Sequence, residues 1–580
     1  MFKAIQYMRA RHWGIFGLSM VFVFFQVYLD LKIPDYMATI TTLVKTPGSP
    51  MAQIWISGGM MLLCALGSLV AAIATGLLSA RLAASFSMDL RERVFDRVQS
   101  FSMEEIDSFS TASLITRSTN DITQIQNFVS RGLQQIVRAP IMAFWALYKI
   151  SLRQWEWTAL TAGAVVIVIG TVAFVVLYAH PRVRRMQSLT DDLNAVTREN
   201  MTGIRVIRAY NAEGYQQNKF EGANSRLTRN ALQARRAMGV MNPTMKFVNN
   251  ALTIGIYCIG AFLIARSGTD GQLTLFSDMV VFSTYAAKLV QAFMSLNMIF
   301  MQIPRVTVSS GRINAVLDAV PKIVDGVRTA GEAGKEGLVE FRNVSFRYPG
   351  AEKAILHNIT FTAEKGQTVA FIGATGSGKT TLVNLIPRLY DATEGQVLVS
   401  GVDVKEYTQH ALHEKLGYAP QKAVLLTGTV ASNVGYGGAS AEQIDRAIDI
   451  AQAREFVEKR DGGLEAEVAR GGSNVSGGQK QRLAIARAVA REPEIYIFDD
   501  SFSALDYRTD KILRSELKKK TAGVTTLIVA QRIGTIRDAD KILVLEEGRI
   551  VGEGTHEELM ASCAVYQEIA STQLSEEELK

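Results

Sequence analysis

Gly373-Ala374-Thr375-Gly376-Ser377-Gly378-Lys379-Thr380 is the stretch that decides the fold of the C-terminal half of this 580-residue chain. It follows the apolar run Thr368–Ile372 and precedes Thr381-Leu382-Val383-Asn384, which has helical character. Glycines between a strand and a helix let successive backbone N–H groups curl around phosphate, and the helix N-terminus adds positive potential. Lys379 is expected to reach the β- and γ-phosphates and the Thr380 hydroxyl to bind Mg²⁺. The octapeptide therefore predicts a phosphate-binding loop for ATP.

Two further segments extend the predicted ATP site. The apolar strand Ile495–Phe498 leads into Asp499, whose carboxylate can complete the Mg²⁺ shell. Upstream of that strand, Ser476-Gly477-Gly478-Gln479 places a serine and two glycines at a helix start, which is a second anion-binding N-terminus. Short β-branched runs alternate with helical stretches from Leu338 onward, and this alternation predicts an α/β nucleotide-binding domain.

The N-terminal half holds most of the apolar residues of a chain that is 48% hydrophobic. Its uncharged runs have the length that a membrane-spanning helix requires, roughly 17–25 residues. We predict six spans, of which the third and the sixth are interrupted by charged residues. They are Trp13–Leu29, Met51–Ala80, Ile141–Leu152, Trp157–Ala179, Phe247–Ala265 and Leu273–Ile303.

The net charge of +7 is distributed as expected for a membrane protein. The connector Pro181–Arg236 holds eleven Lys/Arg against five Asp/Glu, and the N-terminus carries Lys3, Arg9 and Arg11. By the positive-inside tendency, the N-terminus and the long connectors are cytoplasmic. This distribution argues against a nucleic-acid partner. The three cysteines have no metal-like spacing.

The predicted organisation is a six-span α-helical transmembrane domain at residues 1–318, a linker at 319–337 and an α/β domain at 338–580. The linker is rich in Gly, Ala and charged residues. Two long connectors, 81–131 and 181–236, are helically patterned and contain few Pro or Gly residues, so the membrane helices are expected to continue into the cytoplasm. Breaks at Ser108–Ser113 and Gly203–Gly214 predict short transverse helices.

With these motifs in place, the chain resembles one half of an ATP-binding cassette (ABC) exporter over essentially its full length. The resemblance implies that Tyr348 stacks on adenine and that Gln421 links Mg²⁺ to the membrane domain. It implies that Ser476–Gln479 is the signature closing over the opposite subunit's ATP, and that Asp506 lies in the loop crossing the dimer interface. The coupling residues that it implies, at the two breaks, are Ser110, Thr111, Ala112, Ser113, Leu114, Ile207, Arg208, Ala209 and Tyr210.

Two positions depart from the family pattern. The general-base glutamate that follows the Walker B aspartate is replaced by Asp500, and the switch histidine is replaced by Gln531. A base must lie about 2.6–3.2 Å from the attacking water, so a carboxylate retracted by about 1.5 Å should slow hydrolysis. Gln531 can hydrogen-bond a γ-phosphate but cannot carry a proton. The pattern is similar to the degenerate half of heterodimeric bacterial exporters. It implies a non-identical partner half that carries the glutamate and the histidine.

The resemblance implies ATP-driven export of a drug, lipid or peptide-like substrate across the cytoplasmic membrane, with ATP and Mg²⁺ as cofactors. An ATP-gated, non-transporting regulator and an importer of exporter-like architecture are the alternatives. The regulator is disfavoured because no regulatory insert separates the two domains. Among the charges in or near the spans, Lys149 is expected to reach the outer interface beside Arg153. Lys288, deeper in its span, is the candidate for the substrate cavity.

Overall fold

The computed structural model describes residues 6–46, 48–151, 154–267 and 269–573. The chain divides into two compact units. Unit 1 comprises Met1–Gln99 and Thr111–Ala319, and unit 2 comprises Ser100–Ser110 and Val320–Lys580.

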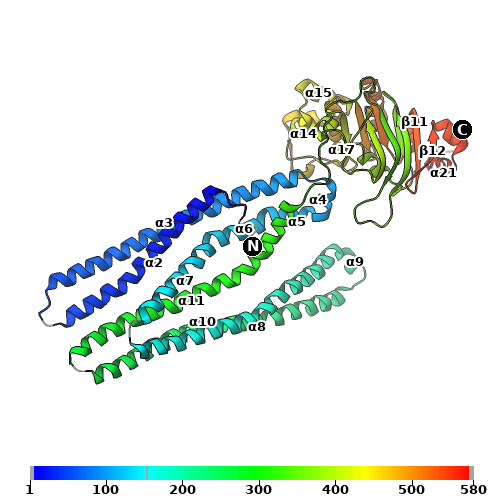
Figure 1. The fold of residues 1–580 in the computed structure, drawn as a ribbon. Coiled ribbons are helices and arrows are strands. Elements are labelled where there is room, and N and C mark those ends of the chain that lie inside the picture. The colour runs from blue at the N-terminus through cyan, green and yellow to red at the C-terminus, as the bar shows by residue number, and fades with distance from the viewer. Residues whose placement is uncertain (1–5, 47, 152–153, 268, 574–580) are drawn as a thin grey trace. The chain divides into compact units, whose positions relative to one another are not determined.

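Long helices form unit 1 (Figure 1). They are α2 (Ala10–Lys45), α3 (Met51–Gln99), α7 (Leu133–Ser151), α8 (Trp155–Thr202), α10 (Glu213–Arg266) and α11 (Thr269–Asp318). Short segments complete the unit, two of them π-helical: α5 (Thr111–Thr116), the π-helix η1 (Arg117–Asp121), α6 (Ile122–Asn127), the π-helix η2 (Phe128–Gly132) and α9 (Ile204–Ala209).

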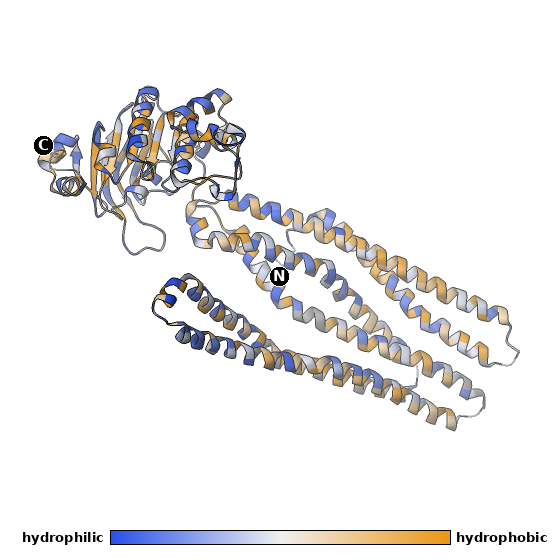
Figure 2. Cartoon of the chain, turned by 180° about the vertical axis from the view of Figure 1, so that it is seen from behind, coloured by the Kyte–Doolittle hydropathy of each residue, from blue (hydrophilic) through white to orange (hydrophobic). Residues whose placement is uncertain are grey.

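Five helices of the described residues are long and apolar enough to cross a membrane. They correspond to five of the six predicted spans: Ala10–Val44, Met51–Gln99, Trp155–Thr202, Glu213–Arg266 and Thr274–Leu296. The other predicted span falls in α7 up to Ser151, and its last residue, Leu152, lies outside the described residues. The apolar character of α7 is diluted by Gln134, Arg138 and Lys149. In Figure 2, apolar residues line the halves of α8 and α10 away from α9, and polar residues gather near α9. The membrane helices thus continue into polar extensions.

The first helix continues past the predicted end of its span at Leu29. Asp30 and Asp35 lie inside α2 because both carboxylates have partners on neighbouring helices. Asp30 accepts a hydrogen bond from Ser68 and lies 3.2 Å from the Arg138 guanidinium. The sequence cannot reveal such partners, so a charge inside a helix looks like the end of a span.

Lys149, expected at the outer interface beside Arg153, forms an ion pair in the last turn of α7. Its Nζ lies 2.8 Å from Oδ2 of Asp35, and both side chains are about a quarter exposed. The Tyr285 hydroxyl on α11 donates to Oδ1 of the same carboxylate at 2.8 Å. The ion pair therefore joins α2, α7 and α11. Arg153, the expected neighbour, lies outside the described residues.

Unit 2 is built on three β-sheets. The largest has the strand order β12-β11-β3-β10-β9-β6 and is parallel except for β12. A four-stranded antiparallel sheet has the order β2-β1-β4-β5, and β7 pairs with β8. The strands are β1 (Val339–Phe346), β2 (Leu356–Ala363), β3 (Thr368–Ile372), β4 (Glu394–Val399), β5 (Val402–Asp403), β6 (Leu416–Ala419), β7 (Gly428–Thr429), β8 (Glu467–Val468), β9 (Ile495–Asp499), β10 (Thr525–Val529), β11 (Lys541–Glu546) and β12 (Arg549–Gly554).

Helices and two hydrophobic clusters surround the large sheet of unit 2. Tyr496 and Phe498 of β9 belong to one cluster, and the alternating Ile495 and Ile497 belong to the other. A parallel strand buried on both faces reads as a continuous apolar run, as this one does. The helices are α4 (Met103–Phe109), α12 (Lys379–Asn384), α13 (Gln409–Glu414), α14 (Val430–Val434), α15 (Ala441–Ile450), α16 (Arg454–Glu458), α17 (Gly477–Ala490), α18 (Tyr507–Lys520), α19 (Ile533–Ile536), α20 (His556–Ser562) and α21 (Ala564–Gln573), with single 3₁₀ turns at Gly435–Gly437, Gly463–Glu465 and Arg470–Gly472.

Candidate nucleotide-binding site

The predicted phosphate-binding loop connects β3 to α12, at the carboxyl end of a central strand of the parallel sheet. Gly373 passes so close to β11 that an added Cβ would lie 2.0 Å from the Leu545 carbonyl oxygen. Gly378 precedes α12 with φ of 98°, a conformation that glycine adopts without a steric penalty. The loop therefore needs glycine at Gly373 because a side chain has no room there, and at Gly378 because of the positive φ. The loop is therefore shaped by the sheet that carries it.

Lys379 and Thr380 lie at the start of α12, where the sequence predicts the phosphate and Mg²⁺ contacts. Lys379 is buried, and its Nζ donates to the carbonyl oxygens of Gly373 and Ala374 at 2.8 Å each. Burial lowers the pKa of this lysine, although Asp500 and Asp499 oppose the effect. The Thr380 hydroxyl donates to Oδ1 of Asp499 at 3.0 Å.

Asp499 is the last residue of β9. In the sheet, β10 lies between β9 and β3. Burial raises the pKa of the Asp499 carboxyl to about 6, although Thr380, Lys379 and the Gln421 backbone oppose the effect. A hydroxyl and a carboxylate at this separation are oxygen ligands of the kind that Mg²⁺ prefers. The donor set therefore fits Mg²⁺, which Thr380 and Asp499 would hold.

Asp500 and Gln531 contact each other directly. The side-chain amide nitrogen of Gln531 donates to Oδ2 of Asp500 at 3.0 Å. Asp500 has φ of 48°, a left-handed conformation that Asp tolerates better than most residues. Its backbone N–H donates a hydrogen bond to the Val529 carbonyl oxygen at 3.0 Å. Burial raises the pKa of Asp500, and a hydrogen bond from Gln421 partly opposes that effect. Gln421, in the loop after β6, therefore contacts both carboxylates, Asp499 through its backbone and Asp500 through its side chain.

Tyr348, the predicted adenine contact, lies at the edge of the phosphate-binding helix. Its hydroxyl is 3.1 Å from Oγ1 of Thr381, and its ring packs edge-to-face on Tyr390, with the ring centroids 5.2 Å apart. The Tyr390 hydroxyl in turn donates to Oδ2 of Asp107 on α4 at 2.8 Å. Sequence reasoning missed both Tyr390 and α4. The only available signal was the acidic cluster Glu104, Glu105 and Asp107 just before the predicted break.

The α4 segment is held to unit 2 by two further contacts. Lys322 forms an ion pair with Glu104, and its backbone N–H donates to Oε1 of Glu105 at 3.2 Å. These contacts explain why Ser100–Ser110 belongs to unit 2, although it was predicted within the transmembrane domain at residues 1–318.

The predicted signature opens α17. Ser476 caps this helix through two reciprocal hydrogen bonds with Gln479. The Ser476 N–H donates to Oε1 of Gln479 at 3.1 Å, and the Gln479 N–H donates to Oγ of Ser476 at 3.4 Å. Ser476 and Gly477 are exposed. None of the hydrogen bonds among the described residues joins Ser476–Gln479 to the phosphate-binding loop of the same chain. The exposed helix start is thus accessible to another molecule.

The predicted interface loop Ser503–Asp506 is fastened to α17. Oε1 of Gln481 accepts a hydrogen bond from the backbone N–H of Ala504 at 2.9 Å, so one buried side chain connects the signature helix to this loop. Asp506 caps α18 by accepting from Thr509 N–H at 2.9 Å. Gln481 was not predicted as a functional residue, since a lone glutamine two positions after a signature carries no recognisable pattern.

The nine predicted coupling residues lie at the ends of short helices. Ser110 ends α4 with φ of 58°, and Thr111, Ala112, Ser113 and Leu114 begin α5. In the second break, Ile207, Arg208 and Ala209 lie in α9 and Tyr210 ends it. Their coupling role stays a prediction.

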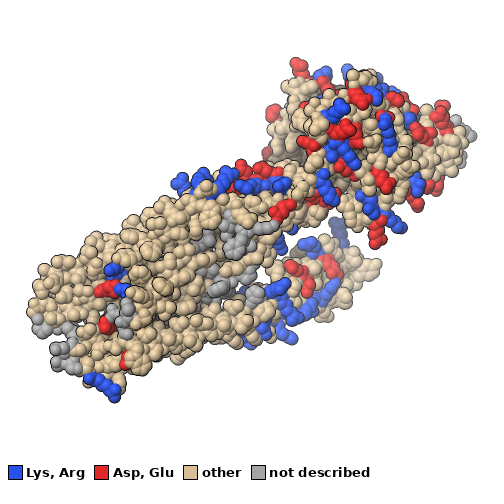
Figure 3. Space-filling view, viewed as in Figure 1, with Lys and Arg blue, Asp and Glu red and all other residues tan. Residues whose placement is uncertain are grey.

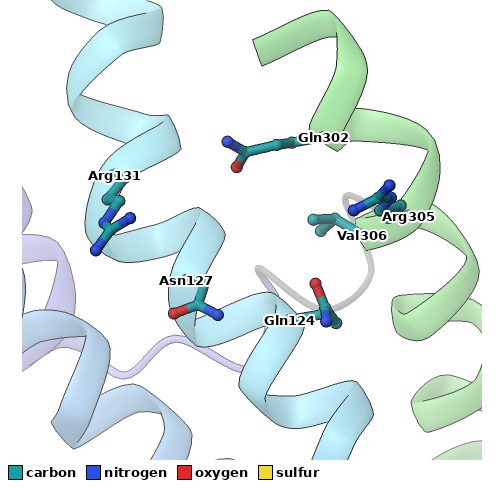
Figure 4. A pocket seen from close by; sticks show the side chains of 6 residues that line it. All are labelled: Gln124, Asn127, Arg131, Gln302, Arg305 and Val306. Carbon is teal, nitrogen blue, oxygen red and sulfur yellow. The ribbon is translucent and has the colours of Figure 1, made fainter. Parts of the chain in front are cut away.

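Unit 1 contains a cavity of about 370 Å³ between α6, η2 and α11 (Figure 4). Its lining is mainly polar, with side chains from both sides: Gln124, Asn127, Arg131, Gln302, Arg305 and Val306. Lys288, the predicted cavity residue, is half-buried on α11 and does not line this cavity.

Comparisons with known proteins agree with this arrangement. Residues 16–293 match the family model for the ABC transporter transmembrane region, and residues 356–503 match the ABC transporter model. The chain is 38% identical to an uncharacterised ABC transporter ATP-binding protein of Mycobacterium tuberculosis, over 89% of this chain and 87% of that protein. It is 31% identical to an ATP-dependent lipid A-core flippase of Aromatoleum aromaticum, over 86% and 82% of the two chains.

The fold is also that of a solved transporter. A bacterial Atm1-family ABC exporter with ATP bound superimposes with a TM-score of 0.81 at 24% identity, covering 97% of this chain and 99% of the other. An exporter-type membrane domain fused to an ATP-binding domain defines a half-transporter. This chain belongs to the ABC transporter family, as a multi-pass membrane half-transporter of the exporter type with a cytoplasmic ATPase domain.

Proposed function

We propose that this chain is the degenerate half of a heterodimeric ABC exporter, whose own ATP site binds nucleotide but hydrolyses it slowly. The observation that carries the proposal is the 3.0 Å contact between Gln531 and Asp500. The positions expected to hold the base and the switch are occupied by a shortened carboxylate and an amide that bind each other. The phosphate and Mg²⁺ side, with Lys379, Thr380 and Asp499, keeps its full set of groups.

The physical consequence is a site that favours binding over chemistry. A general base accelerates proton transfer by roughly 10²–10⁴-fold, and only when it reaches the attacking water. Asp500 is one methylene short, and Gln531 holds one of its oxygens. Bound ATP with Mg²⁺ supplies the phosphoryl bond whose hydrolysis drives transport. At a site where ATP is not hydrolysed, the bound ATP stabilises one conformation of the dimer between turnovers.

The partner in this proposal is a non-identical half-transporter with the catalytic glutamate and the switch histidine. The exposed Ser476 and Gly477 are suited to complete the partner's site, because a helix N-terminus offers N–H donors to the phosphates of a nucleotide held elsewhere. Tyr348 is the proposed adenine contact, and Gln421 connects the Mg²⁺ site to the membrane domain. The segments around α5 and α9 are the proposed coupling helices.

For the substrate, we favour a lipid-like amphipathic molecule among the drug, lipid and peptide-like classes. Its support is the similarity to proteins named ATP-dependent lipid A-core flippases. Lys288 stays a proposed cavity residue. A half-buried, charged lysine within an apolar membrane helix has a high free-energy cost unless it faces water or a ligand.

The test compares the purified chain alone with the chain co-expressed with its cognate half. Alone, it should bind ATP with Mg²⁺ and show little turnover, because both sites of a homodimer would carry Asp500 and Gln531. Co-expression should restore turnover and substrate transport in vesicles. Vigorous Mg²⁺-dependent hydrolysis by the lone chain would contradict the degenerate-site proposal.

A further inference from the structure

Arginines lie on α8 and α10 where the apolar stretches of these helices end, in segments without acidic residues. α8 carries no acidic residue between Glu156 and Asp191, and α10 carries none after Glu221. We call the arginines at positions 182–185 and 229–236 of these two stretches the arginine belt. Its members are Arg182, Arg184, Arg185, Arg229, Arg235 and Arg236.

The arginines of the two helices lie at nearly the same level. The Asn230 side chain donates to the Arg182 carbonyl oxygen at 2.8 Å, and Nε of Arg182 donates to Oε1 of Gln233 at 3.4 Å. Arg229 and Arg235 lie on either side of the segment from Asn230 to Gln233. At a rise of 1.5 Å per residue, each is within about 5 Å of that segment along the helix axis. The side-by-side course of α8 and α10 therefore merges two short basic runs into one surface (Figure 1).

The belt lies at the boundary of the apolar region. The Arg182 guanidinium stacks over the ring of Tyr178, 3.5 Å from its centroid, and Nη1 donates to the Tyr178 carbonyl at 2.7 Å. Tyrosine is enriched at the membrane–water interface, and Tyr178 ends the uncharged stretch of α8. Figure 3 shows Lys and Arg gathering on this hairpin beyond its uncharged part.

The belt has no compensating carboxylates in the described part of the chain. The ion pairs on the hairpin, Lys219–Glu199 and Arg208–Glu213, lie toward α9. Arg184, Arg185 and the three belt arginines of α10 are exposed. Exposed, unpaired guanidinium groups beside a membrane match the phosphate of anionic lipid head groups, which arginine can bind with two parallel hydrogen bonds.

We propose that the arginine belt binds the head groups of anionic phospholipids in the cytoplasmic leaflet. Each basic side chain near such a surface contributes about 1 kcal/mol, and salt screens the attraction. The site lies on the outside of one hairpin of unit 1 and does not depend on the ATP site or on the identity of the partner half.

The test measures binding of phosphatidylglycerol to the purified full-length complex by native mass spectrometry, with phosphatidylcholine as the neutral probe. Arg184→Gln/Arg185→Gln should weaken phosphatidylglycerol binding by roughly tenfold or more and leave phosphatidylcholine unchanged. The matched control is Arg198→Gln/Arg205→Gln, which removes two exposed arginines from the same hairpin, beginning about 20 Å farther along α8. The control should bind as the unaltered complex does.

A second variant separates charge from folding. Arg184→Lys/Arg185→Lys retains the positive charge and should keep most of the binding, whereas a loss caused by misfolding would not be rescued. Raising the salt concentration should release the lipid from the unaltered complex. Equal losses in the belt and control variants, or binding indifferent to both substitution and salt, would overturn the proposal.

Discussion

The side chain of Gln531 donates a 3.0 Å hydrogen bond to the carboxylate of Asp500, although the two residues are thirty-one positions apart in the sequence. Parallel pairing of β9 with β10 places their carboxyl ends together, so the two substitutions lie in one site. This contact leads to a prediction about repairing the site.

Asp500→Glu combined with Gln531→His should create a second hydrolytic centre in the assembled pair if the partner's signature still engages phosphate. An altered partner signature would leave the repair partial, because transition-state charge needs donors from both sides of the interface. Single-turnover assays that trap nucleotide at each site check this. In the unaltered pair, one ATP should be lost slowly and the other quickly. Equal decay at both sites would contradict slow hydrolysis at Asp500.

Substitutions in the signature and in the phosphate-binding loop should differ in effect. Ser476→Ala removes the cap of α17, and Gly477→Asp places a negative charge at its N-terminus, so either should abolish most turnover of the complex. Lys379→Ala should weaken nucleotide binding at the degenerate site and leave more residual transport. Measuring ATPase activity and transport for all three variants tests the asymmetry. Identical behaviour of the two classes would remove its support.

Gly373→Ala should strongly destabilise the ATP-binding domain. The added Cβ would lie 2.0 Å from the Leu545 carbonyl, which belongs to a central strand and cannot yield without disturbing the sheet. We expect a loss of more than about 3 kcal/mol in the free energy of unfolding. Gly376→Ala is the matched control, since its Cβ meets open space and only the positive φ of 87° costs about 1 kcal/mol. Thermal unfolding of both variants provides the comparison, and equal midpoints would be inconsistent with this clash.

Tyr390→Phe should loosen α4 while leaving the Tyr348 packing in place. The substitution deletes the hydroxyl that donates to Asp107 and keeps the ring, and an exposed hydrogen bond to a charged group contributes about 1 kcal/mol or less. Hydrogen exchange of Met103–Phe109 should therefore accelerate with little change in ATP affinity. Tyr390→Ala, which also removes the ring beside Tyr348, should weaken ATP binding in addition. Unchanged exchange in the Phe variant would argue against the hydroxyl as the anchor.

Breaking the Asp35–Lys149 ion pair should cost more than removing both charges. Among the described residues, Lys149→Met leaves the Asp35 carboxylate with the Tyr285 hydroxyl as its remaining donor, and both ionic groups are about a quarter exposed. An unpaired charge in a partly desolvated place is destabilising, whereas an apolar pair of similar volume is often tolerated. Lys149→Met/Asp35→Leu should therefore unfold at a higher temperature than Lys149→Met. Additive losses in the double variant would rule out a direct coupling.

The sequence by itself determined the local chemistry of this protein. Gly373–Thr380 between an apolar strand and a helix specifies a phosphate-binding loop, since the backbone geometry that glycine permits and the groups of Lys379 and Thr380 are local properties. Apolar runs of membrane-spanning length likewise specify a transmembrane domain. The ABC transporter family followed from motifs of this kind and is confirmed by the family matches.

Only the tertiary structure decided which distant residues meet. Asp35 and Lys149 are far apart in the chain, so the sequence did not reveal that they form an ion pair between two helices. The anchoring of α4 through Asp107 and Tyr390 was missed for the same reason. The hydrogen-bonding and ionic groups of a side chain are known from its residue type. Whether another chain segment satisfies them depends on packing, which a periodic pattern does not encode.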